Sequence, residues 1–275
     1  MAELAPRSYL FVPGNRPERI AKAIASGADA VLVDLEDAVP PEEKLAARAA
    51  VREWSAVGSG AVIVRINGVH TPWFADDMDL CRTLGLSTIM LPKVESDADL
   101  LICAELAPHL AILPLIESAR GIYHAVAIAQ HPSTVRLALG SLDLQVDLGL
   151  GGDDESMLYF RSQLVLASRL GHRPPPVDGV FPDIASHQSL HADTLRAKQL
   201  GFGAKLCIHP AQIATVNAAF LPTADELRWA LRVMQAADLS RGAATKVDGQ
   251  MIDRPVILRA QALIAEHERR GLRDP

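Results

Sequence analysis

The chain has few aromatic residues, few cysteines and no excess of basic residues. Aromatic side chains make up only 4% of its 275 residues, whereas hydrophobic residues make up 49%, so the core must be built from Ala, Val, Leu and Ile. The formal net charge of −6 argues against a nucleic-acid binder, which needs a basic surface to neutralise phosphates. Cys81, Cys103 and Cys207 form neither a CxxC pair nor an even disulfide framework, which favours a reducing compartment.

Long hydrophobic runs are also lacking. No apolar stretch approaches the roughly 20 residues that cross a bilayer, so we do not expect a membrane protein. Residues 1–14 do not combine a charged segment with a long apolar segment, so we expect no secretory signal. Together these absences predict an acidic, aliphatic, cytoplasmic globular protein, and most such proteins are enzymes.

Eight short apolar runs, rich in β-branched residues, recur along the chain with helix signals between them. Each run is almost continuously apolar, as is typical of strands that are buried on both faces. The segment after the first run has Pro17 in its first turn and ends at Gly27, and Ser96 is a good N-cap for a later helix. The runs are SYLFVP (from Ser8), AVLVDLE (Ala30), AVIVRIN (Ala61), STIMLPK (Ser87), AILPLIE (Ala111), VRLALGS (Val135), VDGVFPD (Val177) and AKLCIHP (Ala204).

This alternation of strands and helices predicts a (β/α)8 TIM barrel. Eight steps of roughly 29 residues match a barrel of about 250 residues. The alternative is a doubly wound open sheet, but VPGNRPER after the first run lacks the GxGxxG phosphate turn. We predict a barrel domain over residues 1–222. Residues 223–275 are predicted to form a C-terminal helical extension, in which the polar link SRGAATKVDG joins two helices.

Polar residues end nearly every run, and in barrels of this kind the chemistry lies at the carboxyl ends of the strands. Carboxylates that crowd together repel one another unless a cation or protons compensate them. One or two carboxylates with water ligands suit Mg²⁺, so we expect a magnesium site at this end. In chain order the residues are Asp34, Glu36, Asp37, Arg65, Asn67, Lys93, Glu117, Ser141, Asp143, Asp183 and His209.

Several of these residues also have a purely structural interpretation. Asp37 and Asp183 are placed where acidic residues often cap the following helix. Lys93 fits a structural charge partner as well as a functional group. His209, which precedes Pro210, is more consistent with a turn histidine.

Glu117, Asp143 and Arg65 are the stronger candidates. Glu117 and Asp143 closely follow fully apolar strands and do not lie on an obvious solvated helix face. Arg65 ends a buried run, and a buried guanidinium needs an anion. Its planar fork suits a substrate carboxylate.

The chain resembles the citrate lyase β-subunit family, which includes citryl-CoA, malyl-CoA and citramalyl-CoA lyases. The resemblance covers essentially the whole chain and implies a (β/α)8 barrel that assembles as a homotrimer or as a hexamer of paired trimers. The segments that carry it are RSYLFVPGNRPERIAKAIASGADAVLVDLEDAVPPEEKLAAR, VRINGVHTPW, IMLPKVES, ILPLIESARGI, GSLDLQVDLG, GAKLCIHPAQI and DGQMIDRPVILRA.

The resemblance also implies the ligands of the metal and the substrate. Glu117 and Asp143 would hold Mg²⁺, and Arg65 would bind the carboxylate of the acid portion of the substrate. The positions that contact coenzyme A in the family correspond to three residues here, and the two basic ones would face phosphates. These three are Phe11, Arg16 and Lys22.

Further roles follow from the same resemblance. Glu36 and Asp37 resemble groups that hold metal-bound waters. Asp253 is similar to a residue that reaches into a neighbouring subunit's active site for proton transfer. Leu142 departs from the family, which commonly has an acidic residue there, and this difference bears on the exact activity.

The activity so implied is reversible cleavage of a 3-hydroxy-acid acyl-CoA thioester to acetyl-CoA and an oxo acid. One alternative is a class II-type aldolase that acts on a free hydroxy-keto acid, although such aldolases use an early histidine and none precedes His70. Another is a β subunit that works only with a citrate lyase α subunit and an acyl carrier protein. The acid portion stays open, since a pocket distinguishes one methylene by only about 1–3 kcal/mol.

Overall fold

A computed structural model of the chain describes residues 5–55, 62–152, 154–239 and 245–271. It divides into two compact units, of which the first is Ala5–Asn217 and the second begins at Ala218. None of the described helices combines the length and apolar character needed to cross a membrane.

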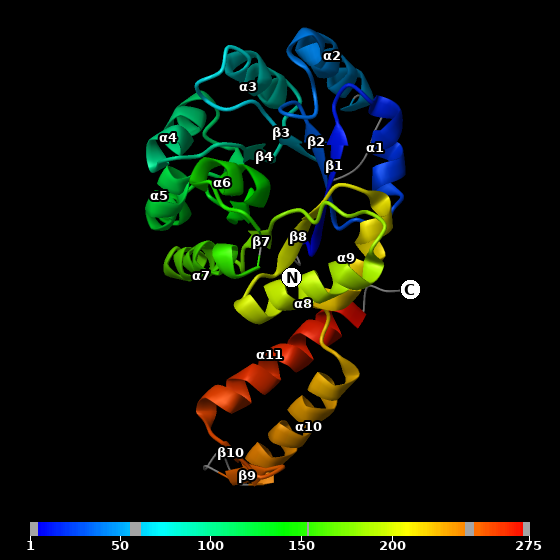
Figure 1. Cartoon of the computed structure of the whole chain (residues 1–275), viewed down its shortest axis with the longest axis vertical. Helices are drawn as coiled ribbons and strands as arrows, with labels where there is room; N and C mark the ends of the chain where they lie inside the picture. The colour runs from blue at the N-terminus through cyan, green and yellow to red at the C-terminus, as the bar shows by residue number, and fades with distance from the viewer. Residues whose placement is uncertain (1–4, 56–61, 153, 240–244, 272–275) are drawn as a thin grey trace. The chain divides into compact units, whose positions relative to one another are not determined.

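The first unit is a closed barrel of eight parallel strands in sequential order, and β8 pairs with β1 to complete the ring (Figure 1). All eight predicted strands and the predicted fold class are confirmed; Ala61, where the third run begins, lies outside the described residues. The strands are β1 (Ser8–Pro13), β2 (Ala30–Asp34), β3 (Val62–Arg65), β4 (Thr88–Leu91), β5 (Ala111–Ile116), β6 (Ala138–Leu139), β7 (Val177–Asp178) and β8 (Ala204–Cys207).

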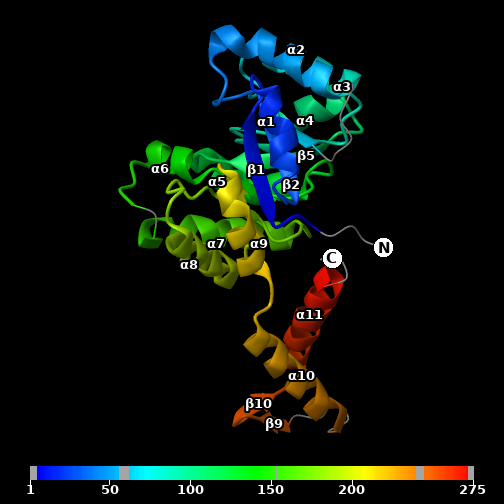
Figure 2. The same ribbon diagram turned by 90° about the vertical axis from the view of Figure 1, so that its right-hand side faces the viewer.

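The strands are apolar on both faces because each face is buried. Alternate residues such as Leu32, Leu115 and Leu206 form a common core cluster. Their neighbours Val31 and Val33 are also buried, as expected for strands that are covered by a layer of helices. Figure 2 shows one such helix, α1, alongside β1 and β2.

The helices begin and end where local signals place them. Pro17 is in the first turn of α1, Ser96 makes a capping box on α4, and Gly201 ends α8 in the left-handed conformation with φ of 104°. Pro40 caps a short 3-10 helix, Pro41–Glu43, which leads into α2. The helices are α1 (Pro17–Ile24), α2 (Lys44–Ser55), α3 (Phe74–Thr83), α4 (Asp97–Leu106), α5 (Ala119–Gln130), α6 (Ser141–Leu148), α7 (Asp154–Leu170), α8 (His187–Leu200) and α9 (Ile213–Phe220).

A buried ion cluster joins the outer face of β7 and β8 to the helices. Asp178 and Lys205 are partners in the strand register, and Lys205 Nζ lies 2.6 Å from a carboxylate oxygen of Asp178 and 2.6 Å from one of Asp193. Arg161 of α7 pairs with Asp178 at 2.9 Å. Burial acts in the opposite direction, but the two cations hold the pKa of Asp178 below its usual value.

The second unit contains two helices, α10 (Ala224–Leu239) and α11 (Arg254–Gly271), and a hairpin of β9 (Thr245–Val247) and β10 (Gln250–Ile252). Residues 240–244 of the predicted polar link lie outside the described residues. The rest of the link forms β9 and a two-residue hairpin turn at Asp248 and Gly249, whose φ angles are 51° and 79°.

Candidate active site

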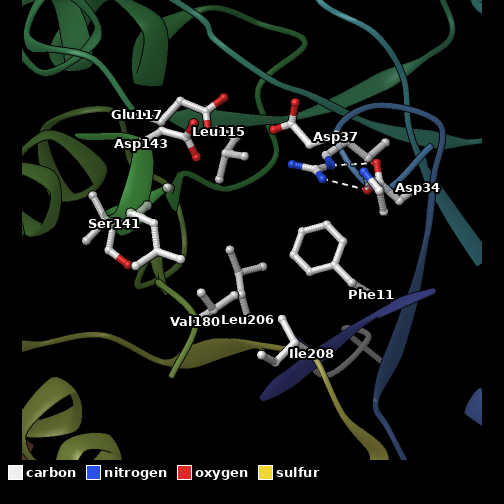
Figure 3. A pocket seen from close by; sticks show the side chains of 15 residues that line it. Phe11, Asp34, Asp37, Leu115, Glu117, Ser141, Asp143, Val180, Leu206 and Ile208 are labelled. Atoms are coloured by element: carbon white, nitrogen blue, oxygen red, sulfur yellow. Dashed lines mark hydrogen bonds and ion pairs between the residues drawn. The ribbon is translucent and has the colours of Figure 1, made fainter. Parts of the chain in front are cut away.

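A cavity of about 340 Å³ opens at the carboxyl ends of the strands (Figure 3). It brings together five of the predicted site residues: Phe11, Asp37, Arg65, Glu117 and Asp143. We call it the barrel cavity. Its lining comprises Phe11, Asp34, Asp37, Ala38, Arg65, Leu115, Glu117, Leu139, Gly140, Ser141, Leu142, Asp143, Val180, Leu206 and Ile208.

Arg65 is held by carboxylates of the chain itself. It ends β3 opposite Asp34, which ends β2, and donates two hydrogen bonds to that carboxylate at 2.7 and 2.6 Å. Its Nη1 lies 3.0 Å from Glu36 Oε2, and its guanidinium carbon is 4.7 Å from the centre of the Phe11 ring. The anion that a buried guanidinium requires is therefore present within the chain. The guanidinium is fixed before any ligand binds.

Glu117 follows β5 directly and is only 3% exposed. Its Oε1 accepts a hydrogen bond from the Lys93 backbone N–H at 2.7 Å, while its buried Oε2 has no hydrogen-bond partner among the described residues. Burial, reinforced by Glu36 and Asp143, raises the pKa of Glu117 to about 8. A Cβ at Gly140 would lie 2.5 Å from Oε2 and 2.5 Å from the Cβ of Glu117, so only glycine fits against this side chain.

Asp143 supplies a second carboxylate from the first turn of α6, and Figure 3 shows it beside Glu117 at the cavity. A buried carboxylate oxygen without a partner next to another carboxylate suits Mg²⁺, which is bound by one or two carboxylates together with waters. Within the part of the chain that the structure describes, no group of three or more His, Cys, Asp or Glu side chains is arranged to hold a metal. A cation at this pair would leave its remaining positions to water and substrate.

Lys93 connects the two acidic parts of the site. Its φ of 52° lies in the left-handed region, which a non-glycine residue seldom adopts. This conformation points the backbone N–H at Glu117, while Nζ pairs with Glu36 Oε1 at 2.5 Å and lies 3.5 Å from Asp37. Lys93 is therefore a charge partner of Glu36, and its place beside the acidic residues of the site leaves a functional role open as well. The pKa of Glu36 is raised by burial, although Arg65 and Lys93 act against it.

Lys44 is a supporting residue that sequence reasoning missed. It is buried, and its Nζ donates hydrogen bonds of 2.7 Å to the backbone oxygens of Leu35 and Glu36 and to Asn67 Oδ1. These bonds hold the loop that carries Glu36. The sequence contains no signal for this role, because a lysine among alanines and glutamates in a helix is expected to be solvated.

Besides Glu36, which contacts Arg65 and Lys93, three other residues predicted from the family resemblance do not line the cavity. Arg16 and Lys22 are exposed, at the N-cap and in the last turn of α1. Asp253 belongs to the second unit, where it precedes α11 and its carboxylate accepts a hydrogen bond from the Val256 N–H at 3.4 Å.

Two polar residues at strand ends have local structural roles. Asp183 accepts hydrogen bonds from the N–H groups of Ala185 and Ser186 at 2.9 and 3.2 Å. His209 Nδ1 accepts one from the Ala211 N–H at 3.2 Å, so the interpretation of a turn histidine is confirmed. Leu142 lines the cavity and is 45% exposed.

The chain is thus a (β/α)8 barrel with carboxylates and a fixed guanidinium at the carboxyl ends of its strands, which is where enzymes of this fold have their active sites. The family described as HpcH/HpaI aldolase/citrate lyase matches residues 7–210, and the chain belongs to it. The resemblance inferred from the sequence and the prediction of a lyase-type enzyme are therefore confirmed at the level of the family.

Similar proteins cover nearly the whole chain. The citrate lyase subunit beta-like protein of Mycobacterium tuberculosis is 37% identical over 263 residues, which is 93% of this chain and 93% of that protein. The (3S)-malyl-CoA thioesterase of Cereibacter sphaeroides is 33% identical over 269 residues, or 95% and 94% of the two chains. The structure of CitE from M. tuberculosis in complex with magnesium, acetoacetate and coenzyme A has a TM-score of 0.87 and 36% identity, and the match covers 96% of this chain and 98% of that one.

Proposed function

We propose that this chain is a Mg²⁺-dependent carbon–carbon lyase that cleaves the coenzyme A thioester of a 3-hydroxy acid to acetyl-CoA and an oxo acid. The observation that carries the proposal is the buried, unpartnered Oε2 of Glu117 beside Asp143, in a cavity that also contains the fixed Arg65. The similarity to a structure that contains magnesium, acetoacetate and coenzyme A supports the same class of reaction.

Glu117 and Asp143 are the residues that would hold the cation. When bound, Mg²⁺ supplies Lewis-acid polarisation of substrate oxygens and neutralises charge that develops on them. The raised pKa of Glu117 fits this role, because a carboxylate that is costly to ionise without a cation is stabilised most strongly when a cation binds to it.

Arg65 would bind the carboxylate of the acid portion. Asp34 accepts two of its N–H bonds and Glu36 lies 3.0 Å from Nη1, but a guanidinium has five N–H donors and so keeps further ones for a substrate. Since Asp34 holds it in position in advance, no reorganisation is required when the substrate binds. Removing one such preorganised donor costs about 3 kcal/mol of transition-state stabilisation.

The bond changes are those of a retro-Claisen or retro-aldol step. The 3-hydroxyl group loses its proton, its oxygen becomes the carbonyl of the oxo acid, and the carbon–carbon bond breaks. The electron pair of that bond passes to the thioester as an enolate, which takes up one proton at carbon to give acetyl-CoA. We propose that Asp253 of a neighbouring subunit transfers protons, and that Glu36 and Asp37 orient water near the metal.

Phe11, Arg16 and Lys22 are proposed to contact coenzyme A. Phe11 lines the cavity, whereas the exposed Arg16 and Lys22 lie along α1, where their charges are accessible to phosphates. A homotrimer or hexamer would complete each site with a residue of another copy.

The test is turnover of a panel of acyl-CoA substrates by the isolated chain, with Mg²⁺ or with EDTA. Oxo-acid release is measured as a phenylhydrazone and free thiol with a thiol reagent. Oxo acid without free thiol supports the lyase. Free thiol without oxo acid supports a second candidate, thioester hydrolysis, which the 33% identical malyl-CoA thioesterase favours. Activity only on a free hydroxy-keto acid, or only with an added α subunit and acyl carrier protein, would contradict the proposal.

Site sharing is tested by mixing two inactive variants. Asp253→Asn is expected to retain substrate binding and lose most of kcat, and Arg65→Ala to lose both. Mixed oligomers should regain part of the activity if Asp253 acts in a neighbouring copy. No recovery in verified mixed oligomers would contradict sharing.

A further inference from the structure

The barrel cavity has two chemically unlike sides. Figure 3 shows the carboxylates of Glu117 and Asp143 on one side, and Val180, Leu206 and Ile208 grouped on the other. The grouping has a simple cause, since β7 and β8 are neighbouring strands and Val180 packs against the core cluster that includes Leu206. We call Val180, Leu206 and Ile208 the apolar wall.

The apolar wall is continuous with the barrel core and is therefore preformed. Leu206 is only 3% exposed and belongs to the inward-facing core cluster. Ile208 is 39% exposed, so the apolar wall extends from the buried core to a partly open edge. A polar group placed against this surface would lose its water without gaining a hydrogen bond from these side chains.

The charges of the cavity set the number of anionic groups that it can accept. Among the described residues that line it, Arg65 is the only cation, and it already contacts Asp34 and Glu36. Four carboxylates line the same space, so Arg65 and one divalent cation together do not outweigh them. One substrate carboxylate at the cation and Arg65 is compensated locally, but a second carboxylate against the apolar wall would have no cationic partner.

We propose, on the basis of the lyase function proposed above, that the apolar wall receives the substituent on the hydroxyl-bearing carbon of the acid portion. The substrate class is then a 3-hydroxy-acyl-CoA with one free carboxylate and a small alkyl group on that carbon. Val180, Leu206 and Ile208 are its specificity-determining residues. A carboxymethyl substituent, as in a citryl group, is selected against.

The test compares kcat/KM for citramalyl-CoA, malyl-CoA and citryl-CoA, whose substituents on this carbon are methyl, hydrogen and carboxymethyl. The methyl substrate should exceed the hydrogen substrate by several-fold to about tenfold, and the carboxymethyl substrate by at least about 100-fold. Citryl-CoA turnover within tenfold of citramalyl-CoA turnover would overturn this inference and leave the lyase function standing. Cleavage of none of the three would remove the proposed function, and this inference with it.

Ile208→Lys tests the apolar wall directly. A cation at this edge should raise the ratio of citryl-CoA to citramalyl-CoA turnover at least about tenfold. Ile184→Lys is the matched control, because Ile184 is 42% exposed but does not line the cavity, and its ratio should stay at the wild-type value. An unchanged ratio in folded Ile208→Lys protein would place the substituent elsewhere.

Val180→Ala is a second variant that needs no new charge. Removing two methyl groups from the wall should lower the ratio of citramalyl-CoA to malyl-CoA kcat/KM at least threefold, mainly by slowing the methyl substrate. A ratio that stays at the wild-type value, with an unchanged melting temperature, would contradict a contact between this wall and the methyl group.

Discussion

Replacing Glu117 with glutamine should destabilise the protein near pH 5 and stabilise it near pH 9. In the metal-free protein the pKa of Glu117 is raised to about 8 from an ordinary 4.5. The folded state therefore binds this proton more tightly than the unfolded state does. The free energy of unfolding falls as pH rises from about 4.5 to about 8, and stays low above that. At 1.36 kcal/mol for each unit, the whole effect is about 5 kcal/mol.

Glutamine removes this titration at a local cost. Its carbonyl oxygen can still accept the Lys93 N–H, but its amide nitrogen would replace the unpartnered Oε2 of Glu117 and leave a buried donor without an acceptor. Such a donor costs about 1–3 kcal/mol. We therefore expect Glu117→Gln to be less stable than the wild type by at most about 2 kcal/mol near pH 5, and more stable by about 2–4 kcal/mol near pH 9.

Urea unfolding in EDTA, across about pH 5 to about pH 9, measures the difference between the two proteins, in which the other titrating groups largely cancel. Glu105→Gln, an exposed position on α4, is the matched control and should follow the wild type. Added Mg²⁺ should stabilise the wild type near pH 8 and have little effect on Glu117→Gln. Wild-type and Glu117→Gln profiles that run parallel over this range would refute the reasoning.

Three further substitutions test other parts of the barrel. Gly140→Ala would place a methyl group 2.5 Å from Glu117 Oε2. The affinity for Mg²⁺, measured by calorimetry, should fall at least about tenfold. An unchanged isotherm would contradict the assignment of Glu117 as a metal ligand. Lys93→Gly can keep the φ of 52° but loses the ion pair to Glu36. The kcat should then fall about tenfold with little change in melting temperature. An unaltered kcat would show that this ion pair does not position Glu36 for the reaction. Asp178→Ala removes the carboxylate that two buried cations share and should lower the free energy of unfolding by about 3–5 kcal/mol. A loss below about 1 kcal/mol in urea unfolding would count against the cluster.

The barrel was predictable because its strands bury both faces. That burial requires continuous apolar runs, and the interruption of such a run marks the strand end where a functional group is placed. Glu117, Asp143 and Arg65 were each identified in this way, and the structure brings all three to one cavity. The hairpin turn at Asp248 and Gly249 was also readable, since Asp-Gly is a strong signal for a two-residue turn.

Contacts that depend on register and on burial of charge were not predictable. The anion that satisfies Arg65 is Asp34, and their pairing follows from how β2 and β3 align. Lys44 has three oxygen acceptors only because a helix crosses a particular loop. Asp178 and Lys205 lie within apolar runs, where the local sequence gives no sign that opposite charges from two strands and two helices meet.

The cavity depends on closure of the ring. Phe11 lies on the first strand and Ile208 directly follows the last, yet both line the same space, because β8 pairs with β1. A chain still in synthesis that ends before Ile208 therefore lacks one side of the cavity, even if its earlier units have folded. Pairing the two ends of the barrel is a contact of very large sequence separation and is expected to form slowly. The rate at which ligand binding appears during refolding would therefore report when the barrel closes, independently of when its helices form.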